Sequence, residues 1–63
     1  MGYRIREKRL EKKMSQEELS KASGVSRTTI SNIESGVDKI VLSSTLKKLA
    51  DALDTTVDQL FSP

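Results

Sequence analysis

The chain has 63 residues, with 11 Lys and Arg against 9 Asp and Glu, a formal net charge of +2, and neither Cys nor His. A chain of this length allows one small domain, over residues 1–63, and its composition excludes a disulfide framework and a zinc site of the usual kind. The commonest catalytic base and the best thiol nucleophile are also missing, which disfavours an enzyme. We therefore expect no catalytic residues, no metal site and no cofactor.

The apolar content is low and scattered. No apolar run approaches the roughly 18 residues of a membrane span, and charged residues interrupt the N-terminal segment where a signal peptide would be apolar. With no Cys, we expect a reducing, cytoplasmic context and no membrane partner. Hydrophobic residues make up 35% of the chain and only two are aromatic, so we expect a thin core that is marginally stable alone or is helped by a partner subunit.

The first predicted helix is basic. It covers residues 3–13, where Ile5, Leu10 and Met14 form a narrow apolar face. Residues 1–13 carry six basic and two acidic residues, about +4, whereas residues 40–63 carry two basic and three acidic residues, or −1. This asymmetry fits either an ordinary solvated helix face or a surface that attracts a polyanion.

Capping residues delimit the second and third predicted helices. Ser15 and Glu18 have the S-x-x-E spacing of a capping box, which predicts that a helix begins at the next residue and covers 16–22. Ser26 is the expected N-cap of a third helix that runs to about Ser35. Each helix is followed by a glycine in the position that favours a left-handed residue, and these are Gly24 and Gly36.

A loop and a fourth helix follow. The loop over residues 37–42 carries the apolar run Ile40-Val41-Leu42, which has no second strand pattern to pair with, so we expect the run to cover the core. Ser43 or Ser44 is the expected cap of the fourth helix. Its inward residues recur at helical spacing: Leu46, Leu49, Ala50 and Leu53.

The last predicted helix is short. Thr56 and Gln59 have the T-x-x-Q spacing of a second capping box, and the helix carries Val57, Leu60 and Phe61. These three apolar residues are the candidate interface of a homodimer, and we expect Leu60 and Phe61 to be the least buried of them in a monomer. The alternative is that they simply close the core.

The segment over residues 16–35 is the most informative. Its two helices are joined by a turn so short that they must cross steeply, which leaves one face of the later helix exposed. By spacing, the inward residues of the segment are Leu19, Val25, Ile30 and Ile33. The outward residues of the later helix are Arg27, Thr28, Ser31 and Asn32. None of the outward residues is acidic, and Arg and Asn are the side chains that read guanine and adenine in the major groove of DNA.

The run SQEELSKASGVSRTTISNIESG, residues 15–36, resembles the helix-turn-helix of the lambdoid phage repressor and Cro (Xre-like) family. The run TLKKLADALDTTVDQLF is similar to the closing helices of that family, and RIREKRLEKKMS extends the likeness over nearly the whole chain. The resemblance implies an all-α, compact five-helix domain whose second and third helices form the helix-turn-helix. It also implies a prokaryotic or phage transcriptional regulator, such as a repressor, that binds double-stranded DNA in the nucleoid, with a homodimer on a palindromic operator.

The resemblance further implies roles for single residues. Arg27, Thr28 and Asn32 take the base-reading positions of the family, with Ser31 beside them. The residues implied to bind phosphates are Gln16, Ser26, Ser35 and Lys39. Simpler roles stay open, because Gln16 can be an ordinary first residue of a helix, Ser31 can face a neighbouring side chain, and Lys39 can be a solubilising loop charge.

Arg9 and Glu34 are expected to form a structural ion pair. Each lies four residues after a residue expected in the core, Ile5 and Ile30, so two opposite charges point toward one core. The family resemblance suggests the same bridge between the first and third helices. We therefore expect an architectural role for this pair and not a contact with DNA.

The second functional hypothesis is a protein-interaction module, an antitoxin or adaptor with the same fold. It predicts an exposed apolar patch on the third helix, where the sequence has none, although Phe61 and the run over residues 40–42 leave it open. No sensor segment is evident, so no small-molecule effector is expected. The operator sequence and the regulated genes do not follow from the sequence.

Overall fold

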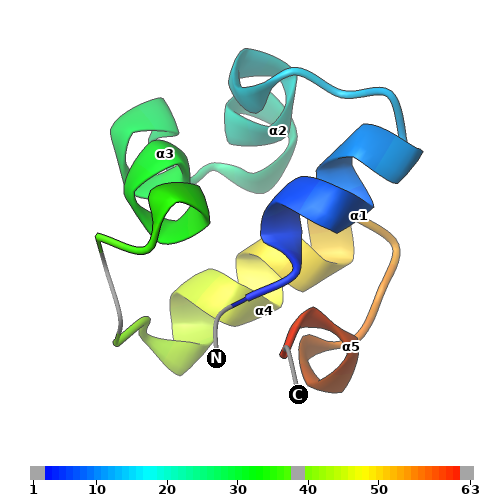
Figure 1. Ribbon diagram of the computed structural model, residues 1–63. Helices are drawn as coiled ribbons and strands as arrows, with labels where there is room; N and C mark the ends of the chain where they lie inside the picture. The colour runs from blue at the N-terminus through cyan, green and yellow to red at the C-terminus, as the bar shows by residue number, and fades with distance from the viewer. Residues whose placement is uncertain (1–2, 38–39, 62–63) are drawn as a thin grey trace.

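The computed structural model describes residues 3–37 and 40–61, which form five helices joined by short connections (Figure 1). In chain order the helices are α1 (Ile5–Glu11), α2 (Gln16–Ser23), α3 (Arg27–Ser35), α4 (Ser43–Ala52) and α5 (Val57–Leu60). The expected all-α fold with five helices is confirmed. No helix among the described residues is long and apolar enough to cross a membrane.

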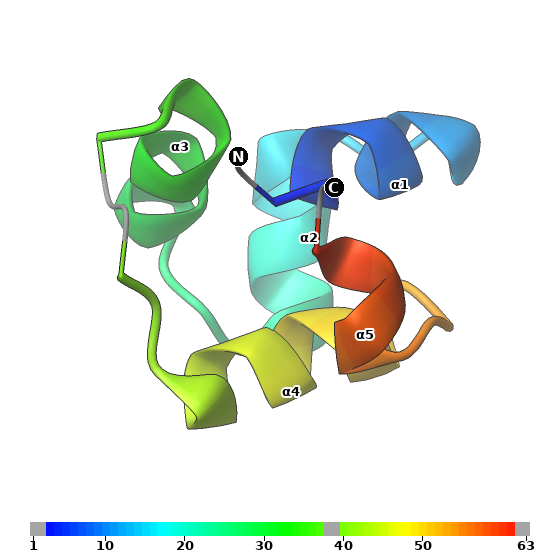
Figure 2. The same ribbon diagram turned by 60° about the horizontal axis from the view of Figure 1, so that its bottom comes forward.

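The helices enclose one core. Figure 2 shows α2 at the centre of the molecule, with α3 on one side of it and α4 beneath, and α2 packs against both. The core consists of the following buried side chains: Ile5, Leu19, Val25, Ile30, Ile33, Leu46, Leu49, Ala50, Leu53 and Leu60. The first and last described residues lie side by side, because Tyr3 and Phe61 form an isolated bridge and their ring centroids are 5.5 Å apart.

The caps around α2 and α3 form as the sequence predicted. Ser15 Oγ accepts from the Glu18 N–H at 3.0 Å, and a Glu18 carboxylate oxygen accepts from the Ser15 N–H at 2.9 Å, which completes the capping box. Ser26 Oγ accepts from a backbone N–H of the first turn of α3 at 3.1 Å. Gly24 and Gly36 end α2 and α3 with φ of 77° and 83°, in the left-handed region that glycine occupies without strain.

The first helix differs from the prediction in length and in its apolar face. It is shorter than the expected range at both ends, and Leu10 is 55% exposed, so its assignment to the apolar face was wrong. At about 100° per residue, position i+5 lies about 140° around the helix from position i. Ile5 is fully buried, and the residue that shares its face is Arg9, at i+4.

The loop after α3 was also predicted incorrectly in part. Ile40 and Leu42 are 92% and 72% exposed, and of the expected apolar cover only Val41 packs on the core. Helix α4 then begins without a serine cap, because Leu42 occupies the N-cap position and forms no side-chain hydrogen bond there. Ser43 and Ser44 lie inside the first turn instead. The four expected inward residues of α4 and its C-terminal flank are all buried.

Only half of the second capping box is present. Thr56 Oγ1 accepts from the Gln59 N–H at 3.2 Å, as expected for an N-cap. The Gln59 side chain, however, accepts a hydrogen bond from Thr55 Oγ1 and does not reach back to the Thr56 N–H. A neighbouring hydroxyl therefore competes successfully for the side chain that the box requires.

The capping box at α2 predicts a pH dependence of stability. Hydrogen bonds from the Ser15 N–H and from the Ser15 side chain lower the pKa of Glu18 below its usual 4.5. A carboxyl whose pKa is lowered by folding stabilises the fold above its unfolded pKa and loses that contribution as the pH falls through the folded pKa. We expect the difference in melting temperature between the parent and Glu18→Ala to be full above about pH 4.5 and to shrink below it. A difference that is constant from pH 7 to pH 3 would contradict this assignment.

Candidate nucleic-acid interface

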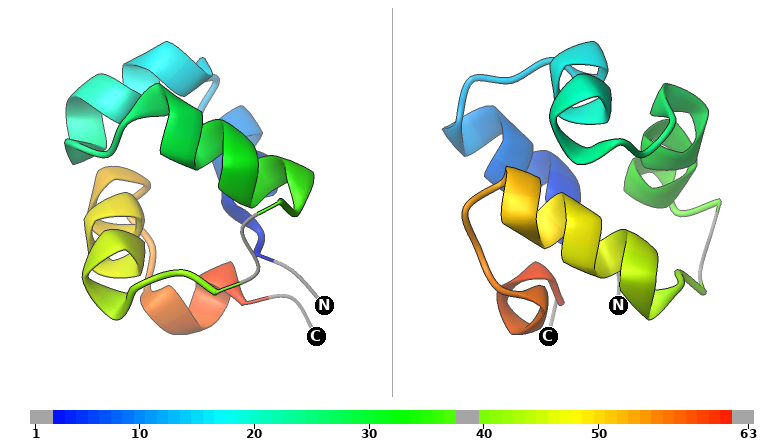
Figure 3. Two further views of the ribbon diagram at one scale, coloured as in Figure 1. Left: turned by 90° about the vertical axis from the view of Figure 1, so that its left-hand side faces the viewer. Right: turned by 180° about the vertical axis from the view of Figure 1, so that it is seen from behind.

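The turn between α2 and α3 exposes one side of α3. In addition to the left-handed Gly24, local hydrogen bonds hold this turn. Ser23 Oγ accepts from the Val25 N–H at 3.1 Å and donates to the Leu19 carbonyl at 2.7 Å. Ile30 and Ile33 are buried and anchor the inner side of α3. In the left-hand view of Figure 3, α3 lies nearest the viewer, with one long side turned away from the rest of the molecule.

The four residues predicted to read bases lie together on this outer side. Arg27, Thr28 and Ser31 are exposed and Asn32 is half-buried. A hollow of about 340 Å³, which we call the α3 hollow, is lined by Gln16, Arg27, Thr28, Ser31 and Asn32. The first residue of α2 and the outward face of α3 therefore form one concave polar surface, and its single charged side chain is a guanidinium.

A second hollow lies beside the first, toward α1. It has a volume of about 210 Å³, and we call it the junction hollow; its lining residues are Arg6, Arg9, Gln16, Ser31, Glu34 and Ser35. Gln16 and Ser31 line both hollows, so the two are neighbours along α3. Ser35, predicted to bind phosphate, lies here, and its hydroxyl donates to the Asn32 carbonyl at 3.3 Å.

Of the four residues predicted to bind phosphate, one lies away from these hollows and another is outside the described residues. Ser26 lines neither of them, and its hydroxyl both caps α3 and donates to Thr29 Oγ1 at 2.7 Å. Lys39 lies outside the described residues. Gln16 and Ser35 are therefore the two members of that set that the structure places next to the base-reading candidates.

The expected ion pair between α1 and α3 is present. Arg9 Nε and Nη2 donate to the two carboxylate oxygens of Glu34 at 2.9 and 3.1 Å, and the two side chains are 10% and 5% exposed. Arg9 Nη1 also donates to the Met14 carbonyl at 2.7 Å, in the connection before α2. Gln16 Nε2 donates to the same carboxylate at 3.2 Å. One carboxylate thus ties α1, α2 and α3 together, and it orients Gln16, one of the two residues that line both hollows.

Most of the cations in and beside α1 form ion pairs. The Arg4 guanidinium donates to both oxygens of the Glu7 carboxylate at 3.0 Å, and this contact lowers the pKa of Glu7 and raises that of Arg4. Lys8 lies 3.9 Å from Glu11, and Lys12 Nζ donates to Asp54 at 3.0 Å. These ion pairs therefore neutralise part of the positive charge of the N-terminal segment.

Arg6 is the residue that the sequence analysis missed. It is exposed on α1, has no ion-pair partner among the described residues, and lines the junction hollow. The sequence held a usable signal, since Arg6 precedes Arg9 by three positions and residues at i and i+3 lie on the same side of a helix. Because Arg9 was expected to pair with Glu34 on α3, Arg6 could also have been expected on the side of α1 that faces α3.

The candidate dimer residues differ widely in exposure. Phe61 is 49% exposed and Val57 is half-buried, but Leu60 is fully buried. The expectation that Leu60 is among the least buried was wrong, and it cannot belong to an exposed interface. Its burial follows from chain pairing, because the Arg4 N–H donates to the Leu60 carbonyl and holds the end of α5 against the start of α1.

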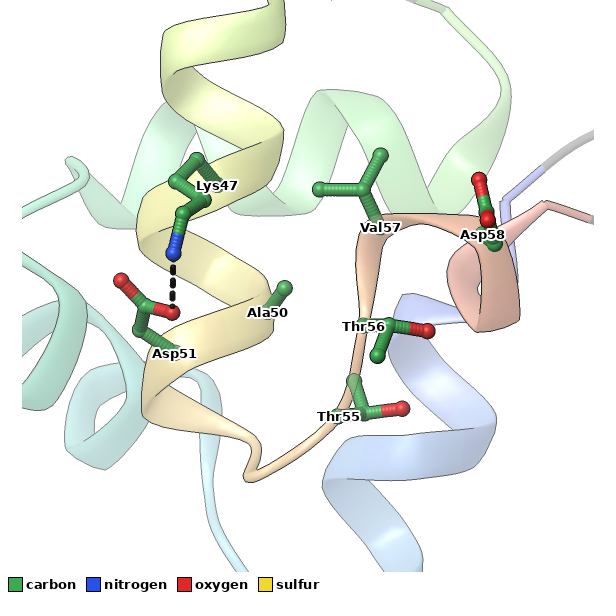
Figure 4. A pocket seen from close by; sticks show the side chains of 7 residues that line it. All are labelled: Lys47, Ala50, Asp51, Thr55, Thr56, Val57 and Asp58. Carbon is green, nitrogen blue, oxygen red and sulfur yellow. Dashed lines mark hydrogen bonds and ion pairs between the residues drawn. The ribbon is translucent and has the colours of Figure 1, made fainter.

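The largest of the three hollows, about 470 Å³, lies between α4 and the start of α5. Figure 4 shows the Lys47–Asp51 ion pair on one wall, at 2.8 Å, and Val57 on the facing segment. It shares no residue with the two hollows at α3. Among the described residues, no group of three or more His, Cys, Asp and Glu is arranged to hold a metal ion.

Comparison with known proteins gives one match. The family model described as helix-turn-helix matches residues 5–60, which is nearly the whole chain. No curated protein and no solved structure matches. The matched residues run from the first residue of α1 to the last residue of α5 and include both hollows at α3.

The ion pair predicts a large stability effect. Glu34→Gln leaves the Arg9 guanidinium buried without its counter-ion, which is expected to cost on the order of 3–5 kcal/mol. Thermal and urea unfolding measure the change, and Glu17→Gln, at an exposed position on α2, is the matched control. The double variant Arg9→Met with Glu34→Met should lose less than the sum of the single variants, because it buries no unpaired charge. An unchanged melting midpoint for Glu34→Gln would rule out a structural role for the pair.

Proposed function

We propose that the chain, which belongs to the phage repressor and Cro-like (Xre) helix-turn-helix family of DNA-binding regulators, binds double-stranded DNA sequence-specifically to regulate transcription. In this proposal residues 1–63 act as one DNA-binding domain, with a helix-turn-helix unit over about residues 16–35. The observation that carries the proposal is the α3 hollow, where five polar side chains from α2 and α3 converge without an acidic residue.

Helix α3 enters the major groove. The groove is about 12 Å wide and accepts an α-helix. Arg27 donates two hydrogen bonds to a guanine, Asn32 pairs with an adenine, and Thr28 offers both a hydroxyl and a methyl group for a thymine. Ser31 lines both hollows, and in this proposal it lies between the residues that read bases and those that bind DNA phosphates.

Phosphate contacts orient the helix in the groove. Gln16 and Ser35 flank the base-reading residues and are the candidate donors to phosphates, together with Ser26 at the N-cap of α3. The Gln16 amide is already oriented by Glu34, which reduces the entropy lost when it binds a phosphate. Lys39 belongs to the same proposal through its family position. Such contacts fix the register of the protein on DNA but carry no base information.

Arg27 provides the sharpest test of this function. We expect Arg27→Ala to weaken binding to the preferred duplex by about 1–3 kcal/mol and to relax sequence preference at one position. Binding sites selected from a random duplex pool by the parent and by the variant measure both effects, with Lys48→Ala on α4 as the control of equal charge. Equal losses on selected and random duplexes would mean that Arg27 contacts phosphate alone. Failure of the parent to bind any duplex would favour the protein-interaction module instead.

We further propose that two copies bind a palindromic operator. The described residues measure 24 Å along their longest axis, whereas successive major-groove faces are about 34 Å apart. A single copy therefore reads one half-site, and a symmetric pair is needed for two. Phe61 and Val57 are the candidate contacts of the dimer, since Leu60 is committed to the core.

The dimer makes a hydrodynamic prediction. In sedimentation velocity with a selected duplex, we expect two copies per palindrome, and Phe61→Glu should reduce this to one copy with weaker binding. Leu10→Glu is the matched control, because Leu10 is exposed to a similar degree, 55% against 49%, but lies on α1. A parent protein that stays at one copy per duplex, or selected sites without a palindrome, would reject the dimer.

A further inference from the structure

The junction hollow is distinct from the α3 hollow in its charge. Its lining contains two guanidinium groups and one carboxylate, and the carboxylate of Glu34 is fully engaged by Arg9 and Gln16. Arg9 and Glu34 therefore cancel, and Arg6 leaves the hollow with a net charge of about +1. Arg6 is exposed and makes no ion pair with any described residue, so its guanidinium is available to a ligand.

We propose that Arg6 binds a backbone phosphate of the DNA duplex in the junction hollow, an inference that rests on the proposed function. The planar guanidinium matches two phosphate oxygens with two parallel N–H donors. The Ser31 hydroxyl lines the same hollow and can donate a hydrogen bond to an anion there. A phosphodiester would thus be held between α1, α2 and α3.

The position of the hollow selects a DNA phosphate over other anions. It adjoins the α3 hollow and shares Gln16 and Ser31 with it, so a duplex that α3 enters brings its backbone past this place. All of its lining side chains are polar or charged, so it offers no apolar anchor of the kind that fixes a peptide partner. Arg9, Glu34 and Gln16 already bond one another, so Arg6 is the cation of this hollow that is left to bind the ligand.

The test measures the salt dependence of DNA binding. Each neutralised phosphate of B-DNA contributes about 0.9 to the slope of log K against log salt concentration. We expect Arg6→Gln to lower the slope by about 0.9 per bound copy between 50 and 200 mM salt, and to weaken binding by the same factor on a selected duplex and on a random duplex of equal length. Fluorescence anisotropy with both duplexes gives the slope directly.

Two variants control for charge and folding. Lys48→Gln removes one positive charge from an exposed position on α4 that lines neither hollow at α3, and its slope should equal that of the parent. Arg6→Lys keeps the charge and should retain the parent slope, with a smaller loss of affinity than Arg6→Gln because the bidentate fork is lost. Thermal melts of all three variants should match the parent, since both positions are exposed.

The measured slopes and affinities separate a failure of the Arg6 inference from a failure of the proposed function. A parent slope in Arg6→Gln would overturn the inference while leaving the proposed function intact, and so would an equal drop in Lys48→Gln. A loss confined to the selected duplex would overturn it as well, because Arg6 would then read a base. A parent protein that binds neither duplex would overturn the proposed function together with this inference.

Discussion

The arrangement of the molecule depends on one buried carboxylate. Glu34 accepts hydrogen bonds from Arg9 and Gln16, and Arg9 in turn donates to the Met14 carbonyl, so a single group on α3 meets α1, the connection before α2, and α2 itself. The buried residues Ile30 and Ile33 set which side of α3 faces inward. Apolar contacts are non-directional, and the bidentate geometry of the ion pair adds a directional constraint on the orientation of α3.

The ion pairs of the N-terminal segment determine which positive charges remain exposed beside α3. Four of the six basic residues of the N-terminal segment pair with described acids on α1, on α3 or in the turn after α4, which lowers the field that α1 exerts at long range. Beside α3, two unpaired guanidinium groups then remain among the described side chains that line the two hollows, Arg27 in one and Arg6 in the other. A chain with a net charge of only +2 can therefore present a local positive surface.

Features set by residues close in sequence, such as helix caps, were predicted well. Features set by contacts between distant segments were predicted less well. The caps at Ser15 and Ser26 and the left-handed glycines involve residues a few positions apart, so sequence spacing determines them. The burial of Leu60 depends on which segments meet across the chain, in particular the pairing of residue 3 with residue 61, whereas the exposure of Leu10 follows from its angular distance from Ile5 on the helix. The site residues were named from spacing and resemblance, but the position of Arg6 depends on the docking of α1 against α3.

Helix α3 can present a long polar face because only a narrow stripe of it is buried in the core. Ile30 and Ile33 are three positions apart and are both buried, which commits a narrow stripe of α3 to packing. The remaining circumference is free for polar side chains, and the helix period places Arg27, Thr28, Ser31 and Asn32 on it together. Because the inner stripe is narrow, apolar packing alone would hold α3 loosely. The ion pair at the C-terminal half of α3 adds a directional contact that the apolar stripe lacks.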